Sequence, residues 1–81
     1  MVSVVLAPAM RAYTGGRVDT EISATNYRAA VRELQQQFPD IPAKMFEKCS
    51  VAIDGVQVQT PLLETFEADS ELVFIPRIAG G

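Results

Sequence analysis

The sequence predicts an α+β domain of two layers, in which one main helix covers one face of a mixed sheet of about five strands. Two observations lead to this prediction. Short runs of β-branched and apolar residues recur along the chain, and one long segment between them carries apolar residues at helical spacing. The chain has 81 residues, 48% of them hydrophobic. This composition supports one small core and argues against disorder.

The first element predicted is a largely buried strand in VSVVLAP, the segment that begins at residue 2. Its residues are short, apolar and β-branched, and Pro8 closes the run. The next segment, AMRAYTGG, has Met10 and Tyr13 three positions apart. This spacing predicts one helical turn whose two side chains face the core.

A second strand is predicted in RVDTEIS, running back beside the first. Gly15 and Gly16 precede it and permit the positive φ angles of a tight reversal. Val18 and Ile22 then alternate with polar residues.

The main helix is predicted in ATNYRAAVRELQQQFPD. Apolar side chains at helical spacing give it one buried face: Tyr27, Ala30, Val31, Leu34 and Phe38. Thr25 or Asn26 can cap its first turn by accepting a backbone N–H. Pro39 disfavours helical geometry in the residue before it, so we expect the helix to end near Phe38. Arg28 and Arg32 lie on the polar face, where we expect them to be solvated.

A connector and a hairpin follow the helix. In DIPAKMFEKC, we expect Met45, Phe46 and Cys49 to cover the open end of the core. In SVAIDGVQVQ, two alternating runs flank Asp54-Gly55. This dipeptide is a strong signal for a two-residue hairpin turn.

The last part of the domain is predicted to be a loop, a turn and a final strand. TPLLETF is expected to pack Leu62, Leu63 and Phe66 against the sheet, and ADSE to turn the chain. LVFIP forms the last strand. If the helix crosses with the usual right hand, it covers one sheet face only. The opposite face then has no cover within this chain, and we expect a partner to bind there.

Composition excludes several kinds of site. The chain has no histidine and a single cysteine, Cys49, so no Ser-His-Asp or Cys-His site, usual zinc ligand set or internal disulfide can be formed. We expect Cys49 to be a structural, partly buried thiol. Glu64 and Glu67 lie in a polar segment with nothing to bury them, so we do not expect them to form a catalytic carboxylate pair.

Charge and cysteine content bear on partners and location. A net charge of −3 argues against binding to a nucleic-acid backbone. The acidic residues gather at Glu64, Glu67, Asp69 and Glu71, which we interpret as a solvated face; the alternative is a patch that steers a basic partner. An unpaired thiol favours a reducing compartment, and MVSVVLAPAM has no basic leader and is too short to span a bilayer. We therefore expect a cytoplasmic protein without membrane contact.

The C-terminal run FIPRIAGG offers the one reactive group that these exclusions leave, the carboxylate of Gly81. A Gly-Gly end is thin and conformationally free, so it can enter a narrow channel in another protein. Pro76 stiffens the exit from the sheet. Arg77 and Ile78 offer one charged and one apolar contact along such a channel.

These residues carry a family resemblance. SELVFIPRIAGG, together with VAIDGVQVQTPL, resembles the MoaD/ThiS family of ubiquitin-like sulfur carriers. MRAYTGG is also similar to an Arg-x-x-Thr-Gly-Gly stretch in carriers that serve cysteine synthesis. Arg77 stands where many molybdopterin carriers have a second proline.

The resemblance implies a β-grasp domain over residues 1–76 and a flexible tail over 77–81. It implies that a partner enzyme uses ATP to adenylate Gly81, which then becomes a thiocarboxylate that donates sulfur. Gly80 and Gly81 match the essential tail of the family. The lead-in to this tail is matched by Pro76, Ile78 and Ala79. Phe74 matches an apolar strand position on the partner-binding sheet face. The chain itself would bind no cofactor and would have no autonomous active site.

The partners that the resemblance implies are the adenylating enzyme and a sulfur-accepting synthase subunit, such as the molybdopterin synthase large subunit. Molybdopterin synthesis is the leading interpretation, and cysteine, thiazole and tRNA thiolation are alternatives. A second interpretation is a ubiquitin-like protein modifier, in which Gly81 forms an isopeptide bond with a lysine of a target protein. The tail does not separate these two interpretations, because both use the same activated acyl group. A third interpretation is an interaction domain that uses its open sheet face and has an idle tail.

Overall fold

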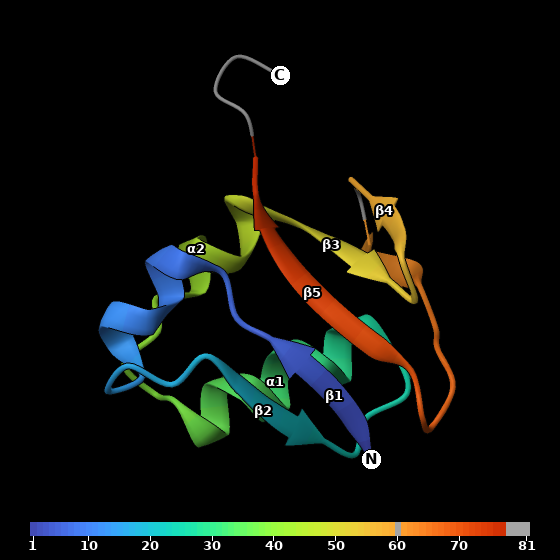
Figure 1. Ribbon diagram of the computed structural model, residues 1–81, viewed down its shortest axis with the longest axis horizontal. Helices are drawn as coiled ribbons and strands as arrows, with labels where there is room; N and C mark the ends of the chain where they lie inside the picture. Colours follow the sequence, from blue (N-terminus) through green and yellow to red (C-terminus); the bar gives the residue numbers. More distant parts are fainter. Residues whose placement is uncertain (60, 78–81) are drawn as a thin grey trace.

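A computed structural model describes residues 1–59 and 61–77 of the chain. It contains one five-stranded sheet with the strand order β2-β1-β5-β3-β4. The strands are β1 (Val2–Val5), β2 (Asp19–Ile22), β3 (Cys49–Ile53), β4 (Val56–Val58) and β5 (Glu71–Pro76). β1 and β5 pair in parallel, and the other neighbouring strands are antiparallel. The first and last strands of the chain are thus neighbours near the centre of a mixed sheet (Figure 1).

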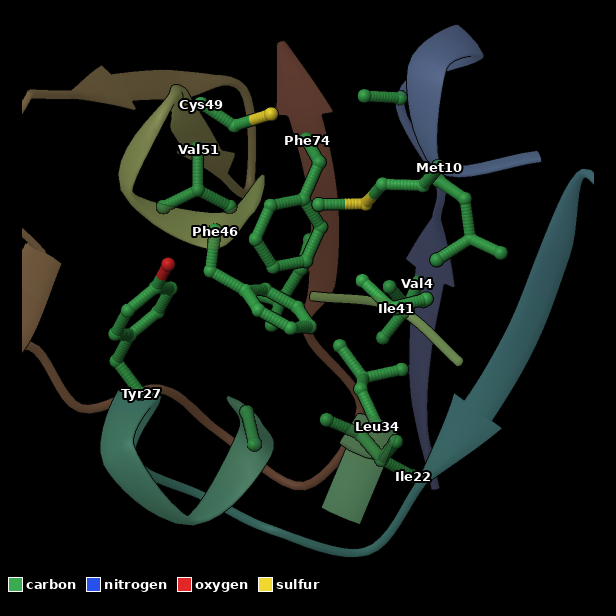
Figure 2. Close-up of a cluster of buried hydrophobic side chains, with 14 of the residues drawn as sticks. Val4, Met10, Ile22, Tyr27, Leu34, Ile41, Phe46, Cys49, Val51 and Phe74 are labelled. Carbon is green, nitrogen blue, oxygen red and sulfur yellow. The ribbon is translucent and has the colours of Figure 1, made fainter. Parts of the chain in front are cut away.

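The helices supply the second layer. The main helix is α1 (Tyr27–Gln37), and a shorter helix, α2 (Ala43–Glu47), lies in the connector before β3. Two 3₁₀ segments, η1 (Pro8–Tyr13) and η2 (Pro61–Leu63), complete the fold. The helical side chains pack with alternate residues of β1, β3 and β5 in one core, which Figure 2 shows in part. This arrangement is the β-grasp fold, which confirms the two-layer α+β prediction and the fold that the family resemblance implied.

Local signals in the sequence set the bounds of several elements. The side chain of Asn26 caps α1 by accepting a hydrogen bond of 2.9 Å from the N–H of Ala29. The helix ends at Gln37, two residues before Pro39. Between β3 and β4, Asp54 and Gly55 have φ angles of +50° and +85°, as a two-residue hairpin turn requires. These three local predictions are confirmed.

Some apolar side chains lie where the sequence did not place them. Met10 is buried, but Tyr13, the last residue of η1, is 39% exposed, so the prediction that both face the core is wrong. Leu62 and Leu63 are also exposed, and Pro61 is the η2 residue that is buried. Phe66 does pack against the core. A 3₁₀ turn of three residues presents only part of its surface to the sheet, which explains why both leucines cannot be covered.

The connector matches its prediction more closely. Phe46 and Cys49 are buried, and Met45 packs against the core. No helix of the described residues is long and apolar enough to cross a membrane.

Candidate functional site

The C-terminal end of β5 projects beyond its parallel neighbour. Pairing with β1 stops at Val5 and Val73, whereas pairing with β3 continues to Cys49 and Pro76. From Phe74 onward, no strand of the described residues pairs with β5 on its β1 side (Figure 1). Such a position accepts proline, which has no N–H to donate to a sheet. The predicted lead-in residue Pro76 is thus the last residue of a projecting strand end.

Arg77 binds back to the domain. Its backbone N–H donates to the carbonyl of Lys48 at 3.1 Å, which extends the contact between β5 and the start of β3. Its Nε donates to the carbonyl of Cys49 at 3.4 Å, and its Nη2 donates to the carbonyl of Gln59. One side chain thus bridges the beginning of β3 and the segment just after β4. The sequence suggested a contact in a partner channel for Arg77, and nothing in the pattern indicated these acceptors.

The remaining predicted tail residues, Ile78, Ala79, Gly80 and Gly81, lie outside the described residues. The structure does describe Pro76 and Arg77, from which these residues continue, and we call this pair the tail base. Three hydrogen bonds from Arg77 hold that base to the body of the domain. A tail that begins at a fixed point loses less conformational freedom when a partner binds it than one that begins in a loose loop.

The open sheet face is the surface opposite α1. Its apolar part is formed by Val5, Ala52, Val73 and Ile75, and the strand register places Ser3, Ser50 and Glu71 on the same side. Val73 is the register partner of both Val5 and Ala52, so these three side chains form a row across three strands. All four apolar residues are half-buried. Their neighbours in the strands, among them Val4, Val51 and Leu72, are buried on the core side. Among the described residues these four apolar side chains stay partly exposed to solvent, whereas Ser50 on the same side is buried; that a partner binds this face stays a prediction.

Phe74 does not belong to that face, so the prediction that it binds a partner there is wrong. It is 2% exposed, and its ring lies 5.8 Å from that of Phe46 and 6.2 Å from that of Tyr27, centroid to centroid (Figure 2). Adjacent residues of a strand point to opposite faces, and Phe74 shares the core side with Leu72. Val73 and Ile75 are the β5 residues that face outward.

The groups beside the tail base are not chemically activated. Burial raises the pKa of the Cys49 thiol above its ordinary value, and the nearby Arg77 guanidinium opposes this effect. Burial likewise raises the pKa of Tyr27 to about 12. Both groups are therefore neutral near pH 7, which agrees with the expectation that Cys49 is a structural thiol.

The segment that resembles an Arg-x-x-Thr-Gly-Gly motif closes η1. The hydroxyl of Thr14 lies within hydrogen-bonding distance of the carbonyls of Arg11 and Arg17, at 3.3 and 3.1 Å. Gly15 and Gly16 have φ angles of +66° and +87°, which favour glycine. This local geometry explains the threonine and the two glycines of the motif, but not Arg11, whose Nη2 donates to the carbonyl of Leu6 at 3.3 Å.

The acidic residues form no site that the structure reveals. Glu64, Glu67, Asp69 and Glu71 are all exposed, which agrees with a solvated face. In residues 1–59 and 61–77, no three Cys, Asp or Glu side chains gather closely enough to hold a metal ion.

A cleft on the helix side of the sheet was not predicted. It lies between α1, α2, η2 and the tail base and has a volume of about 630 Å³. We call it the helix-side cleft. Arg28, Arg32 and Arg77 line it together with Tyr27, Val31 and Phe46. Arg28 and Arg32 are exposed, as the sequence predicted, but only the tertiary structure brings η2 and Arg77 to the same cleft.

Solved structures share this fold over the full chain. A chain of the Amycolatopsis orientalis BexX/CysO complex has a TM-score of 0.82 and 20% sequence identity, with 100% of both chains covered. SAMP1 from Haloferax volcanii has a TM-score of 0.71 and 20% identity over 99% of this chain and 98% of that chain. The Haloferax volcanii HVO 2177 protein has a TM-score of 0.69 and 13% identity over 99% and 85%. No family model and no curated protein matches the sequence. Because the sequence identities to these structures are 20% or lower, the structural similarity establishes the β-grasp fold and not a shared function.

Proposed function

We propose that this chain is a ubiquitin-like carrier that donates sulfur from the carboxyl group of Gly81. The observation that carries the proposal is the projecting end of β5, where Pro76 and Arg77 form a fixed base and the sequence continues with Ile-Ala-Gly-Gly. Partner enzymes would recognise the folded domain, while the chemistry takes place at the C-terminal tail. Two findings support this proposal. FIPRIAGG resembles the C-terminal segment of sulfur carriers, and the fold matches that of CysO, which was solved in complex with BexX.

The proposed chemistry needs a partner enzyme at each step. In the first step, the Gly81 carboxylate attacks the α-phosphorus of ATP, pyrophosphate leaves, and an acyl adenylate forms. In the second step, hydrosulfide attacks the acyl carbon, AMP leaves, and the terminus becomes a thiocarboxylate. Glycine suits this role because it has no side chain to hinder attack on its carbonyl. ATP binds to the activating enzyme and not to this chain.

We further propose that the sulfur serves molybdopterin synthesis, with a synthase large subunit as the acceptor. Cysteine, thiazole and tRNA thiolation are the alternative destinations. These can be separated by adding the thiocarboxylate form of the chain to each acceptor enzyme and measuring which one consumes it. We expect loss of the thiocarboxylate to require the molybdopterin subunit.

The experiment that tests the carrier function is the intact mass of the chain after incubation with its activating enzyme, ATP and sulfide. We expect the mass increase of one oxygen replaced by sulfur, located by peptide mapping in the fragment that ends at Gly81. Mapping is essential because oxidation of Met1, Met10 or Met45 adds nearly the same mass. Omitting ATP should abolish the change, and deleting Gly81 should abolish it without unfolding the domain.

Two other results would contradict the carrier proposal. If Gly81 is recovered in isopeptide bonds with lysines of other proteins and no thiocarboxylate is found, the chain is a modifier. If the terminus stays unmodified while the domain still binds the activating enzyme, the chain is an interaction domain.

A further inference from the structure

The helix-side cleft has a cationic rim in an acidic protein. The chain carries a net charge of −3, yet three arginines line this cleft against one acidic residue, Glu47. Arg28 and Arg32 are four residues apart on α1, where like charges repel one another. Arg77 binds backbone carbonyls, which are neutral acceptors, so it keeps its full charge.

The acidic residue of α1 does not neutralise this rim. The carboxylate of Glu33 accepts hydrogen bonds from the N–H of Ser23 at 3.0 Å and the N–H of Ala24 at 3.2 Å. It also accepts one from the hydroxyl of Ser23 at 3.1 Å. Glu33 is thus bound to the segment after β2. The positive charge of Arg28 and Arg32 remains available to a ligand.

The floor of the cleft is apolar and continues onto the surface. Tyr27, Val31 and Phe46 line it, and Leu62 at its edge is 57% exposed. The adjacent Leu63 is 83% exposed. An apolar surface that extends past the cleft favours a macromolecular ligand over a small one, because a small molecule would leave both leucines uncovered. A cationic rim around an apolar floor is complementary to an acidic chain segment that carries an apolar side chain.

We propose that the helix-side cleft is a docking surface for an acidic segment of a partner protein. The segment would place an apolar side chain against Tyr27 and Phe46 and its carboxylates beside Arg28 and Arg32. This surface lies on the other side of the sheet from the open sheet face, so a partner can use it while that face is occupied. The proposal does not depend on the chemistry of Gly81.

An NMR titration of the full chain with a synthetic peptide tests the proposal. The probe is Glu-Asp-Phe-Leu-Asp-Glu, acetylated and amidated at its ends. We expect shifts of the backbone amides of α1, α2 and η2 and of the Nε resonances of Arg28 and Arg32. Raising NaCl from about 50 to about 500 mM should weaken binding. Replacing the acidic residues of the peptide with Gln and Asn, or its Phe-Leu with Ser-Ser, should also weaken it.

Substitutions in the chain supply the matched control. Arg28→Gln and Arg32→Gln should each weaken binding by roughly twofold to fivefold, as expected for exposed charge pairs. Arg17→Gln removes the same charge from a residue outside the cleft, whose side chain stacks on Phe38. Because Arg17 does not line the cleft, this substitution should leave the affinity within about 1.5-fold, since salt screens exposed charges that make no direct contact with the ligand.

Four results of the peptide titrations would overturn the proposal. They are shifts that map to the open sheet face, equal weakening by Arg17→Gln, unchanged binding of the Ser-Ser peptide, and no binding at all. Shifts of the Arg28 and Arg32 side chains when residues 78–81 are deleted, without peptide, would assign the cleft to the chain's own terminus. The same shifts on raising the protein concentration would assign it to a second copy. Either assignment would also overturn the proposal.

Discussion

The guanidinium of Arg77 donates to carbonyls at the start of β3 and just after β4, two segments that are adjacent only in the folded protein. Hydrogen bonds from a charged donor are stronger than neutral ones, although exposure to water weakens them. The planar group reaches two acceptors at once, which the ammonium group of lysine does less well. Arg77 therefore stabilises the strand end from which the tail continues.

We predict that Arg77→Lys lowers the free energy of unfolding by roughly 0.5–1.5 kcal/mol, because the bridge to the two carbonyls is lost. Urea unfolding followed by circular dichroism measures this change. Arg32→Lys is the matched control on an exposed residue and should stay within about 0.5 kcal/mol of the wild type. Equal stability of all three proteins would show that the hydrogen bonds of Arg77 contribute nothing.

A second prediction concerns the thiol of Cys49, which is 3% exposed and has a raised pKa. At pH 8, iodoacetamide should modify Cys49 at least about tenfold more slowly in the native protein than in urea, because only an accessible thiolate reacts quickly. Mass spectrometry of quenched samples gives the two rates.

The pH dependence of Cys49 has a definite sign. Because the folded-state pKa is above the ordinary value of 9.0, the stabilisation from the neutral thiol is present below pH 9 and is lost as the pH rises further. Native and unfolded protein reacting at the same rate would contradict the buried position.

At the scale of elements, the β3–β4 hairpin is tied to the start of β5 through Asp54. Its carboxylate accepts hydrogen bonds from the N–H of Glu71 at 2.9 Å and from the hydroxyl of Ser70 at 2.7 Å. These two bonds, the first being the larger cause, lower the pKa of Asp54 below its ordinary value of 3.8. The turn residue thus also fixes the register between the hairpin and the central strand.

The sign of the resulting pH effect follows from linkage. A lowered folded-state pKa gives a stabilisation that is present above pH 3.8 and is lost as the pH falls through the folded-state pKa. We predict that Asp54→Asn, which tolerates the positive φ but does not titrate, reduces the fall in melting temperature between pH 6 and pH 2.5. Asp40→Asn, an exposed carboxylate elsewhere, is the control. An identical fall for Asp54→Asn and wild type would contradict this account.

At the scale of the whole molecule, the buried side chains of the core extend from Val2 to Phe74 among the described residues. Arg77, where the described part of the chain ends, is hydrogen-bonded to the domain. The family resemblance placed the boundary between the domain and the tail after Pro76. The hydrogen bonds of Arg77 place this residue in contact with the body, so stability should depend on whether truncation removes it.

We predict that deleting residues 78–81 changes the melting temperature by less than about 2 °C, whereas deleting 77–81 lowers it by about 4–8 °C for each kcal/mol that Arg77 contributes. Differential scanning calorimetry of the two truncated chains measures this contrast. A large loss on removing residues 78–81 alone would show that the tail belongs to the folded domain.

The sequence by itself determined the five strands, the main helix and several of their ends, but it did not show that the connector contains the short helix α2. The cap at Asn26, the stop before Pro39 and the turn at Asp54-Gly55 depend on residues a few positions apart, so their chemistry can be recognised in a short window. The α+β class follows from the order of these elements.

Only the tertiary structure decided which side chains share a surface. The run LVFIP is apolar throughout, and a shift of one position exchanges its two faces, so the pattern could not show that Phe74 is buried while Val73 and Ile75 face outward. The acceptors of Arg77 and the lining of the helix-side cleft come from segments distant in sequence. Such contacts depend on strand order and packing, which the 2-residue and 3.6-residue periods of a single strand or helix do not encode.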